Sequence, residues 1–217
     1  MHTCEPTTPQ GATGGRVNQK LRTRRAIVQA AVELMRTGRE VTMLEVAKAA
    51  LVSEATAYRH FPDLASLLRE AMEGQMPTPA EALVSVADSR DPVERVAVAA
   101  EHLLRLVLTY QGATRAMIAA TITRPDTGAA TRPAMRFGLI DHALAPLDDT
   151  LGVTDPAAVR QLKNGLAVVV SAEALFALTD LARLDPEDAV ASVVHTATAL
   201  TRAALDSAAG GRPTAQR

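Results

Sequence analysis

The side chains richest in chemistry lie close together in one short segment, Ser53-Glu54-Ala55-Thr56-Ala57-Tyr58-Arg59-His60-Phe61. This segment carries hydroxyls, a phenol, a guanidinium and an imidazole within about two helical turns. Such groups hydrogen-bond to phosphate oxygens, and a guanidinium also pairs with the edge of a guanine base. On an exposed helix, these residue types predict contact with a nucleic acid. The alternative interpretation is core packing, which applies most strongly to Phe61.

A second short helix is predicted just before this segment. Thr42 and Glu45 have the Thr-x-x-Glu spacing of a capping box, which satisfies free backbone N–H groups at a helix start. Ser53 is a suitable N-cap for the helix that follows. Apolar residues between the two caps would brace the second helix and fill the turn: Val46, Ala47, Ala50 and Val52. Two short helices with this bracing predict a helix-turn-helix, whose second helix enters the major groove of DNA.

Within the second helix, Ala57 and Phe61 are predicted to face inward, which leaves the polar positions outside. We expect Tyr58 and His60 to contact phosphates and Arg59 to read guanine. Glu54 repels phosphate, so it would read cytosine or lie in the groove away from the backbone. The full set of predicted DNA contacts is Arg22, Arg24, Thr42, Ser53, Glu54, Thr56, Tyr58, Arg59 and His60.

Charge is divided unevenly along the chain. Residues 1–62 carry nine basic and five acidic residues, a balance of +4, whereas the remainder carries 14 basic and 19 acidic residues, a balance of −5. A basic first part suggests a polyanionic partner for that part alone, although a solvated helix face gives the same balance.

The whole chain is predicted to be helical. Apolar residues make up 47% of the 217 residues but aromatic residues only 2%, so the core must consist of Ala, Leu and Val. Asp-Pro pairs resemble helix starts at residues 91, 155 and 185. Helical segments are expected at about 21–36, 42–50, 53–61, 64–72, 91–111, 113–123, 133–151, 155–183 and 185–208, with a loop over 124–133.

Other classes of protein find little support in the sequence. Cys4 is the single cysteine, so an intramolecular disulfide is impossible and a cytoplasmic setting is expected. No apolar run reaches the roughly 20 residues that span a membrane. The motifs Gly-x-Ser-x-Gly and His-Glu-x-x-His and a glycine-rich phosphate loop are all missing, and the five histidines are far apart. We therefore expect no enzyme activity, no metal and no cofactor.

Residues 22–72 resemble the DNA-binding domain of the TetR family of bacterial transcriptional regulators. The family's Thr-x-x-x-Ile/Val-Ala opening is matched by Thr42, Val46 and Ala47, and Leu67 and Leu68 match its fourth helix. Its Val-Ser…Thr-Leu-Tyr-x-His-Phe signature is matched by Val52, Ser53, Thr56, Ala57, Tyr58, Arg59, His60 and Phe61. The resemblance implies a phosphate contact for Thr42 in addition to its capping role.

Two positions depart from the family pattern. Leu51 stands in the turn where the family usually has glycine, so either the turn is adjusted or Leu51 is strained by about 1 kcal/mol. Leu64 stands where the family often has a phosphate-contacting lysine at the start of the fourth helix. We therefore expect fewer phosphate contacts from that helix and more from Arg22, Arg24 and Arg25.

The resemblance implies an all-α fold with an N-terminal three-helix helix-turn-helix DNA-binding domain and a C-terminal helical domain for ligand binding and dimerisation. The expected boundaries are 1–18 for a disordered tail, 19–76 for the DNA-binding domain, 77–208 for the second domain and 209–217 for a second tail. The segments 155–183 and 185–208 would form the homodimer interface. Two recognition helices about 34–36 Å apart would then read a palindromic DNA operator.

The second domain is expected to enclose a small-molecule effector. Candidate contacts on or near apolar stripes are His102, Leu106, Tyr110, Met117, Thr121, Phe137, Asp141, His142, Asn164 and Phe176. Each of these residues alone is more often a core or surface residue than a ligand contact. The aliphatic composition favours a largely apolar effector, whose binding would shift the fourth helix and release the DNA. Alternatives are a ligand-independent DNA-binding regulator and, less favoured, a helical enzyme or binding protein.

Overall fold

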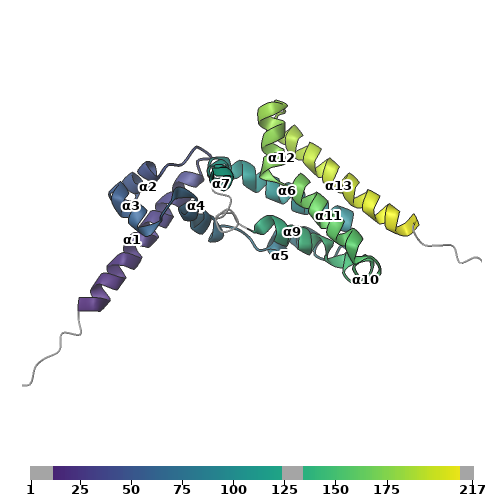
Figure 1. The fold of residues 1–217 in the computed structure, drawn as a ribbon, viewed down its shortest axis with the longest axis horizontal. Helices are drawn as coiled ribbons and strands as arrows, with labels where there is room; N and C mark the ends of the chain where they lie inside the picture. Colours follow the sequence, from purple (N-terminus) through teal and green to yellow (C-terminus); the bar gives the residue numbers. More distant parts are fainter. Residues whose placement is uncertain (1–11, 124–133, 211–217) are drawn as a thin grey trace, which may run out of the picture.

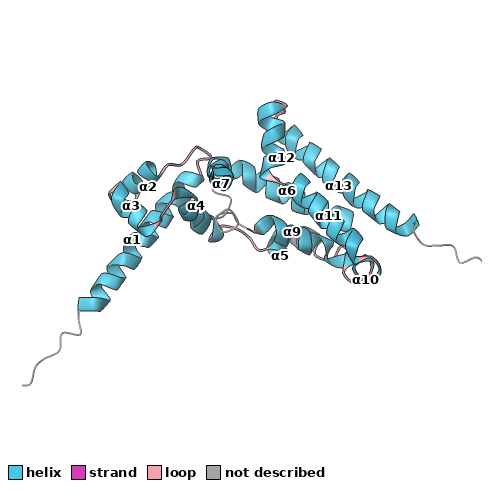
Figure 2. Cartoon of the chain, in the orientation of Figure 1, coloured by secondary structure: helices cyan, strands magenta, loops and turns pink. Residues whose placement is uncertain are grey.

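The computed structural model describes residues 12–123 and 134–210. Every regular element in these residues is a helix, so the predicted all-α fold class is confirmed (Figures 1 and 2). The predicted loop at 124–133 and the outer parts of both predicted tails lie outside the described residues.

The N-terminal domain consists of α1 (Ala12–Met35), α2 (Met43–Ala49), α3 (Glu54–His60) and α4 (Leu64–Glu73). Side chains cap three of these helices. The predicted Thr42–Glu45 capping box is present at α2, Ser53 accepts the N–H of Thr56 at α3, and Asp63 accepts the N–H of Ser66 at α4. Each cap satisfies a backbone donor that the helix itself leaves free. The domain core includes the predicted braces Val46 and Ala47 and the predicted inward residues Ala57 and Phe61, while Ala50 and Val52 are partly buried against it.

Two tail predictions are wrong in part. Residues 12–18 form the first turns of α1 instead of a tail, and Figure 1 shows these turns projecting beyond α2, α3 and α4. Among the residues of α1 whose burial is described, Ile27 is the first that is buried, which explains why an apolar pattern did not reveal the earlier turns. At the other end, residues 209 and 210 still belong to the last helix.

The second part of the chain, which we call the body, begins after α4. Its elements are α5 (Pro79–Ala82), η1 (Val84–Val86), α6 (Pro92–Thr109), α7 (Gln111–Thr123), α9 (Met135–Leu144), η2 (Ala145–Leu147), α10 (Leu151–Thr154), α11 (Pro156–Val169), α12 (Ala172–Phe176), η3 (Ala177–Leu181) and α13 (Pro186–Gly210). Asp91 and Asp155 cap α6 and α11, with proline next, as predicted. In the body α6 packs against α13 and α9.

One long helix predicted for 155–183 is interrupted. α11 ends at Val169, and Ser171 then caps α12 by accepting the N–H of Ala174. The axes of the two segments differ by 42°. No single helix among the described residues is long and apolar enough to cross a membrane. The two segments of this bent pair, taken together, would be long and apolar enough by length and composition alone. Leu162, Leu166 and Leu175 of the pair are buried in the body's own cores.

A buried arginine holds one end of the body together. Arg95 on α6 is 5% exposed, and its guanidinium donates to the backbone carbonyls of Val86, Ala87, Ser89, His142 and Ala143. Two of these carbonyls lie in the last turn of α9, where the helix dipole favours a positive charge. Arg95 therefore ties α6 to α9 and to the turn after η1.

Helix α7 joins the body to the N-terminal domain. Tyr110, Ala113 and Met117 are buried in the same apolar cluster as the cores of α1 to α4. Gly112 is buried where any Cβ atom would collide with the backbone of Arg39, in the link between α1 and α2. The predicted boundary at residue 76 therefore divides the sequence but not the packing, because residues after position 76 complete the core of the N-terminal domain.

Candidate nucleic-acid interface and body groove

The recognition helix α3 presents an ordered polar face. Ser53 Oγ lies 2.9 Å from Thr56 Oγ1, and a guanidinium nitrogen of Arg59 donates to Thr56 Oγ1 over 3.2 Å. These three residues follow one another at steps of three, so they lie along one side of the helix. Arg59 is exposed, and its position is set before any partner binds. A guanidinium held this way is suited to the bidentate contact that reads guanine.

The remaining predicted contacts on α2 and α3 surround this face. Glu54 is exposed in the first turn of α3, and Tyr58 is 48% exposed, so its phenol is available to a phosphate. Thr42 is exposed, but its hydroxyl also donates to the Glu45 carboxylate over 2.9 Å. Arg22 is exposed on α1. The assignment of these residues to DNA contacts stays a prediction.

The turn before α3 is strained at Leu51. Its φ is 55°, in the left-handed region that favours glycine, and its side chain is 93% exposed. Because the side chain packs against little, the strain is not offset by burial. The backbone N–H of the next residue, Val52, donates to the Ala47 carbonyl, which closes the turn. Of the two outcomes predicted for Leu51, the structure shows the strained residue.

Arg24 is held inside the domain, which bears on its predicted DNA contact. Its guanidinium pairs with both carboxylate oxygens of Glu70 on α4 and donates to the carbonyl of His60 over 2.8 Å. It also lies over the ring of Phe61, 4.1 Å from the centroid. All three nitrogens therefore have partners within the protein. Arg24 fastens the end of α3 to α1 and α4.

His60 lies at the end of α3 in a positively charged environment. Burial lowers the pKa of His60 below its ordinary value, and the charges of Lys20, Arg24 and Arg59 lower it further. Its Nδ1 atom is buried and has no hydrogen-bond partner among the described residues.

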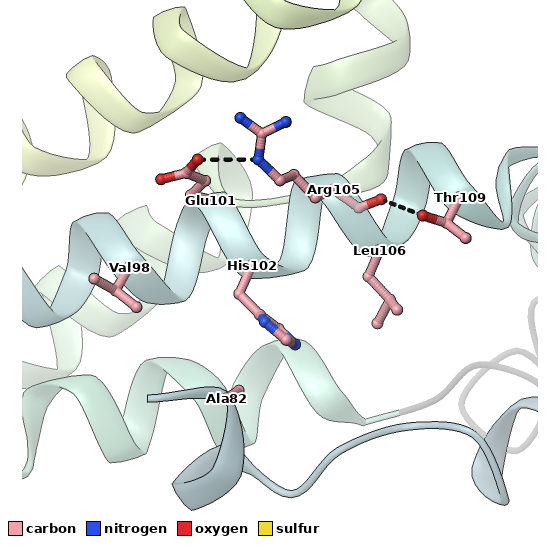
Figure 3. Close-up of a pocket in the computed structure, with 7 residues that line it drawn as sticks. All are labelled: Ala82, Val98, Glu101, His102, Arg105, Leu106 and Thr109. Atoms are coloured by element: carbon pink, nitrogen blue, oxygen red, sulfur yellow. Dashed lines mark hydrogen bonds and ion pairs between the residues drawn. The ribbon is translucent and has the colours of Figure 1, made fainter. Parts of the chain in front are cut away.

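The ten predicted effector contacts do not share one pocket. His102 and Leu106 on α6 line a groove, together with Ala82, Val98, Glu101, Arg105 and Thr109 (Figure 3). Tyr110 and Met117 are core residues at the junction with the N-terminal domain. The sequence pattern does not distinguish the groove residues from the core residues. Helical periodicity indicates that a residue is buried, but it does not indicate which element packs against that residue.

The other six candidates lie elsewhere in the body. Thr121 is half-buried and donates to carbonyls of its own helix, and Asp141 pairs with Lys163 over 2.8 Å. His142 gives its carbonyl to Arg95, while Asn164 is exposed on α11. Phe137 is 53% exposed beneath Arg136, and Phe176 is buried beneath Arg115. Their roles as effector contacts stay predictions.

Sequence reasoning missed an ionic connection between α7 and η3, the element that follows α12. Arg115 makes two hydrogen bonds to Asp180, of 2.6 and 2.8 Å, and lies 3.8 Å from the centroid of Phe176. The pair lowers the pKa of Asp180, chiefly through the hydrogen bond. No local pattern marks these residues, because 65 positions separate them in the sequence.

Comparison with known proteins agrees with this geometry. The sequence profile described as "Bacterial regulatory proteins, tetR family" matches residues 27–71, which span α2, α3, most of α4 and the C-terminal part of α1. A similar solved structure is the crystal structure of a TetR transcriptional regulator from Rhodococcus sp. RHA1. That likeness has a TM-score of 0.50 at 24% identity and covers 83% of this chain and 96% of that chain, so it shows the fold. A comparison with curated proteins found no match.

The matched segment and its exposed α3 define a helix-turn-helix DNA-binding protein. Residues 27–71 match the tetR family of bacterial regulatory proteins, as the sequence predicted, and the helical fold is similar to that of a solved TetR transcriptional regulator.

Proposed function

We propose that this protein is a homodimeric repressor that binds a palindromic DNA operator and leaves it when a small, largely apolar effector binds to the body. The observation that supports this proposal most directly is the ordered polar face Ser53–Thr56–Arg59 on an exposed recognition helix. Repression is proposed because a dimer on an operator blocks polymerase, which is the family's usual outcome.

Dimerisation is supported by two helix faces that the body leaves exposed. On α13, the small residues Ala191, Ala199 and Ala203 are exposed at helical spacing. On α11, Val168 is 73% exposed. These helices already pack closely within one chain, since a Cβ on Gly165 would touch Leu200. Faces rich in small residues allow a second pair of helices to approach in the same way.

Coupling to an effector is supported by the position of the body groove. Leu106 lines the groove and also packs against the N-terminal core. Beyond it α6 ends at Thr109, and α7 packs against α4. A ligand that prefers one position of Leu106 would therefore bias the placement of α4 and the recognition helix.

Selection of bound sequences from a random pool of duplex DNA, with the full-length protein, tests the proposal. A palindrome is expected, with half-sites whose centres lie about 34–36 Å apart. Recovery of a single half-site would contradict the dimer, and recovery of no preferred sequence would contradict operator recognition. Replacing both Tyr58 and Arg59 with alanine should abolish the preference, while Arg90→Ala, an exposed arginine of the body, should keep it.

A further inference from the structure

The body groove has a volume of about 400 Å³ and lies along one side of α6. Figure 3 shows His102 and Leu106 pointing from α6 toward the segment that carries Ala82. Ala82, Val98 and Leu106 supply apolar walls. This size falls within the range of about 300–1,000 Å³ in which small-molecule sites are found.

Most polar groups that line the groove are already engaged. Arg105 donates to Glu101 over 3.0 Å and to both carboxylate oxygens of Glu187 over 3.1 Å. The hydroxyl of Thr109 donates to the carbonyl of Arg105 in its own helix. The guanidinium is therefore committed at all three nitrogens, and it offers no free positive charge to an anionic ligand.

His102 is the exception. Its Nε2 atom is buried and has no hydrogen-bond partner among the described residues. A buried polar atom without a partner destabilises a protein, so native structures usually supply one. Within this groove, the unmet hydrogen bond of His102 is the polar feature that a bound molecule can satisfy once the side chains that cover Nε2 move aside.

We propose that His102 anchors an uncharged, mainly apolar molecule through a single hydroxyl group. A hydroxyl suits the ring because it both donates and accepts, so it can pair with Nε2 whether or not that nitrogen carries a proton. A carboxylate or phosphate is disfavoured, since Arg105 is engaged and Glu101 at the rim repels anions. This inference rests on the proposed effector response, and it adds the anchoring residue and the chemical class of the ligand.

Three small probes of similar shape test the inference on the full-length protein: phenol, toluene and benzoate. Binding is followed by the nitrogen resonances of the histidine rings in NMR spectra. Phenol should bind about fivefold more tightly than toluene, the ratio expected for one net hydrogen bond, and more tightly than benzoate. Phenol should also shift the Nε2 resonance of His102, whereas toluene should leave it nearly unchanged.

Two variants separate the hydrogen bond from the apolar walls. His102→Phe keeps a ring without nitrogen, so phenol and toluene should bind equally. Val98→Ala removes part of a wall and should weaken both probes by a similar factor while the fivefold preference remains. Equal binding of phenol and toluene to the wild-type protein, tighter binding of benzoate, or a preference that survives His102→Phe would overturn the inference.

The wild-type measurement needs no variant to fold, so it decides the question on its own. Operator binding is measured separately, by gel shift without any probe. Absence of operator binding would contradict the proposed function, whereas operator binding without discrimination between phenol and toluene would contradict the role of His102.

Discussion

The N-terminal domain and the body are both helical, but different forces set their geometry. In the N-terminal domain, capping hydrogen bonds between residues three positions apart, such as Thr42 and Glu45, fix where helices start. A buried apolar cluster then fixes how these helices pack. In the body, charged side chains connect segments 47 to 82 positions apart, as at Arg95, Arg105 and Arg115. The start of α3 is therefore defined locally, although Arg24 also ties its end to Glu70, 46 positions away, and the body depends more on distant parts of the chain.

The largest expected effect tests the long-range part of this comparison. Arg95→Ala leaves five backbone carbonyls without this donor, two of them in buried and three in partly buried hydrogen bonds. We expect a loss of about 3–5 kcal/mol in the free energy of unfolding, measured by chemical denaturation. Arg90→Ala, at an exposed arginine nearby, should change stability by less than about 0.5 kcal/mol. Similar stability of the two variants would show that the connection is not needed.

The second prediction separates two arginines of the N-terminal domain. Arg24→Ala removes the contacts to Glu70, His60 and Phe61 and should lower stability by about 1–2 kcal/mol, because the group is partly exposed to solvent. Arg59→Ala should leave stability within about 0.5 kcal/mol and weaken operator binding by about 1–3 kcal/mol. Thermal melting and gel shift measure the two effects. The opposite pattern would assign Arg24 to the DNA surface and Arg59 to the fold.

The third prediction concerns the body groove. His102→Phe replaces a buried nitrogen that lacks a partner with carbon, so the ligand-free protein should gain about 1 kcal/mol of stability. Differential scanning calorimetry of the two proteins without ligand measures this gain. His142→Phe, at another half-buried histidine of the body, is the comparison and should give no gain. A loss of stability in His102→Phe would mean that the ring serves the fold.

The fourth prediction concerns the strained turn. Leu51→Gly relieves the strain of a non-glycine residue at positive φ, but glycine also has more conformational freedom in the unfolded chain. The net effect should be a stabilisation of about 0.5–1 kcal/mol. Leu51→Ala keeps a Cβ at the same φ and should give no gain. Urea denaturation compares the three proteins, and equal stability of the Gly and Ala variants would contradict the strain.

The smallest effect is a dependence on pH at His60. The folded-state pKa lies below the unfolded value of about 6.5, so the unfolded chain binds more protons as the pH falls through this range. Stability should therefore fall between about pH 7.5 and about pH 5.5, and His60→Gln should reduce this difference. The same substitution at exposed His195 controls for the loss of a histidine and should keep the wild-type difference. An unchanged pH profile in His60→Gln would contradict the lowered pKa of His60, which burial and then the charges of Lys20, Arg24 and Arg59 produce.

Much of the N-terminal domain could be predicted because its signals are local. The caps at Thr42 and Ser53 and the inward positions of Ala57 and Phe61 follow from short spacings, and all are present. The role of Arg24 could not be predicted in this way. Its partner Glu70 lies 46 positions away, and a basic residue near a DNA-binding helix has the same appearance in sequence whether it faces a phosphate or a carboxylate.

The body shows where sequence patterns stop being informative. Tyr110 and Met117 were predicted to line a pocket, but they complete the core of the other domain, since a stripe does not identify its partner. The break between Val169 and Ser171 was missed because the composition on both sides remains favourable for a helix. His102 and Leu106 were found as candidates, whereas the groove that joins them depends on Ala82, which approaches from another segment.

The glycine at the start of α7 has a consequence for exchanging domains between related proteins. Gly112 lets the body touch the backbone of Arg39 directly, so the junction requires a residue without a Cβ on one side and a fitting link between α1 and α2 on the other. A chimera that joins this body to a foreign DNA-binding domain must therefore carry over both surfaces of the junction. The transferable unit is the DNA-binding domain together with the helix that completes its core.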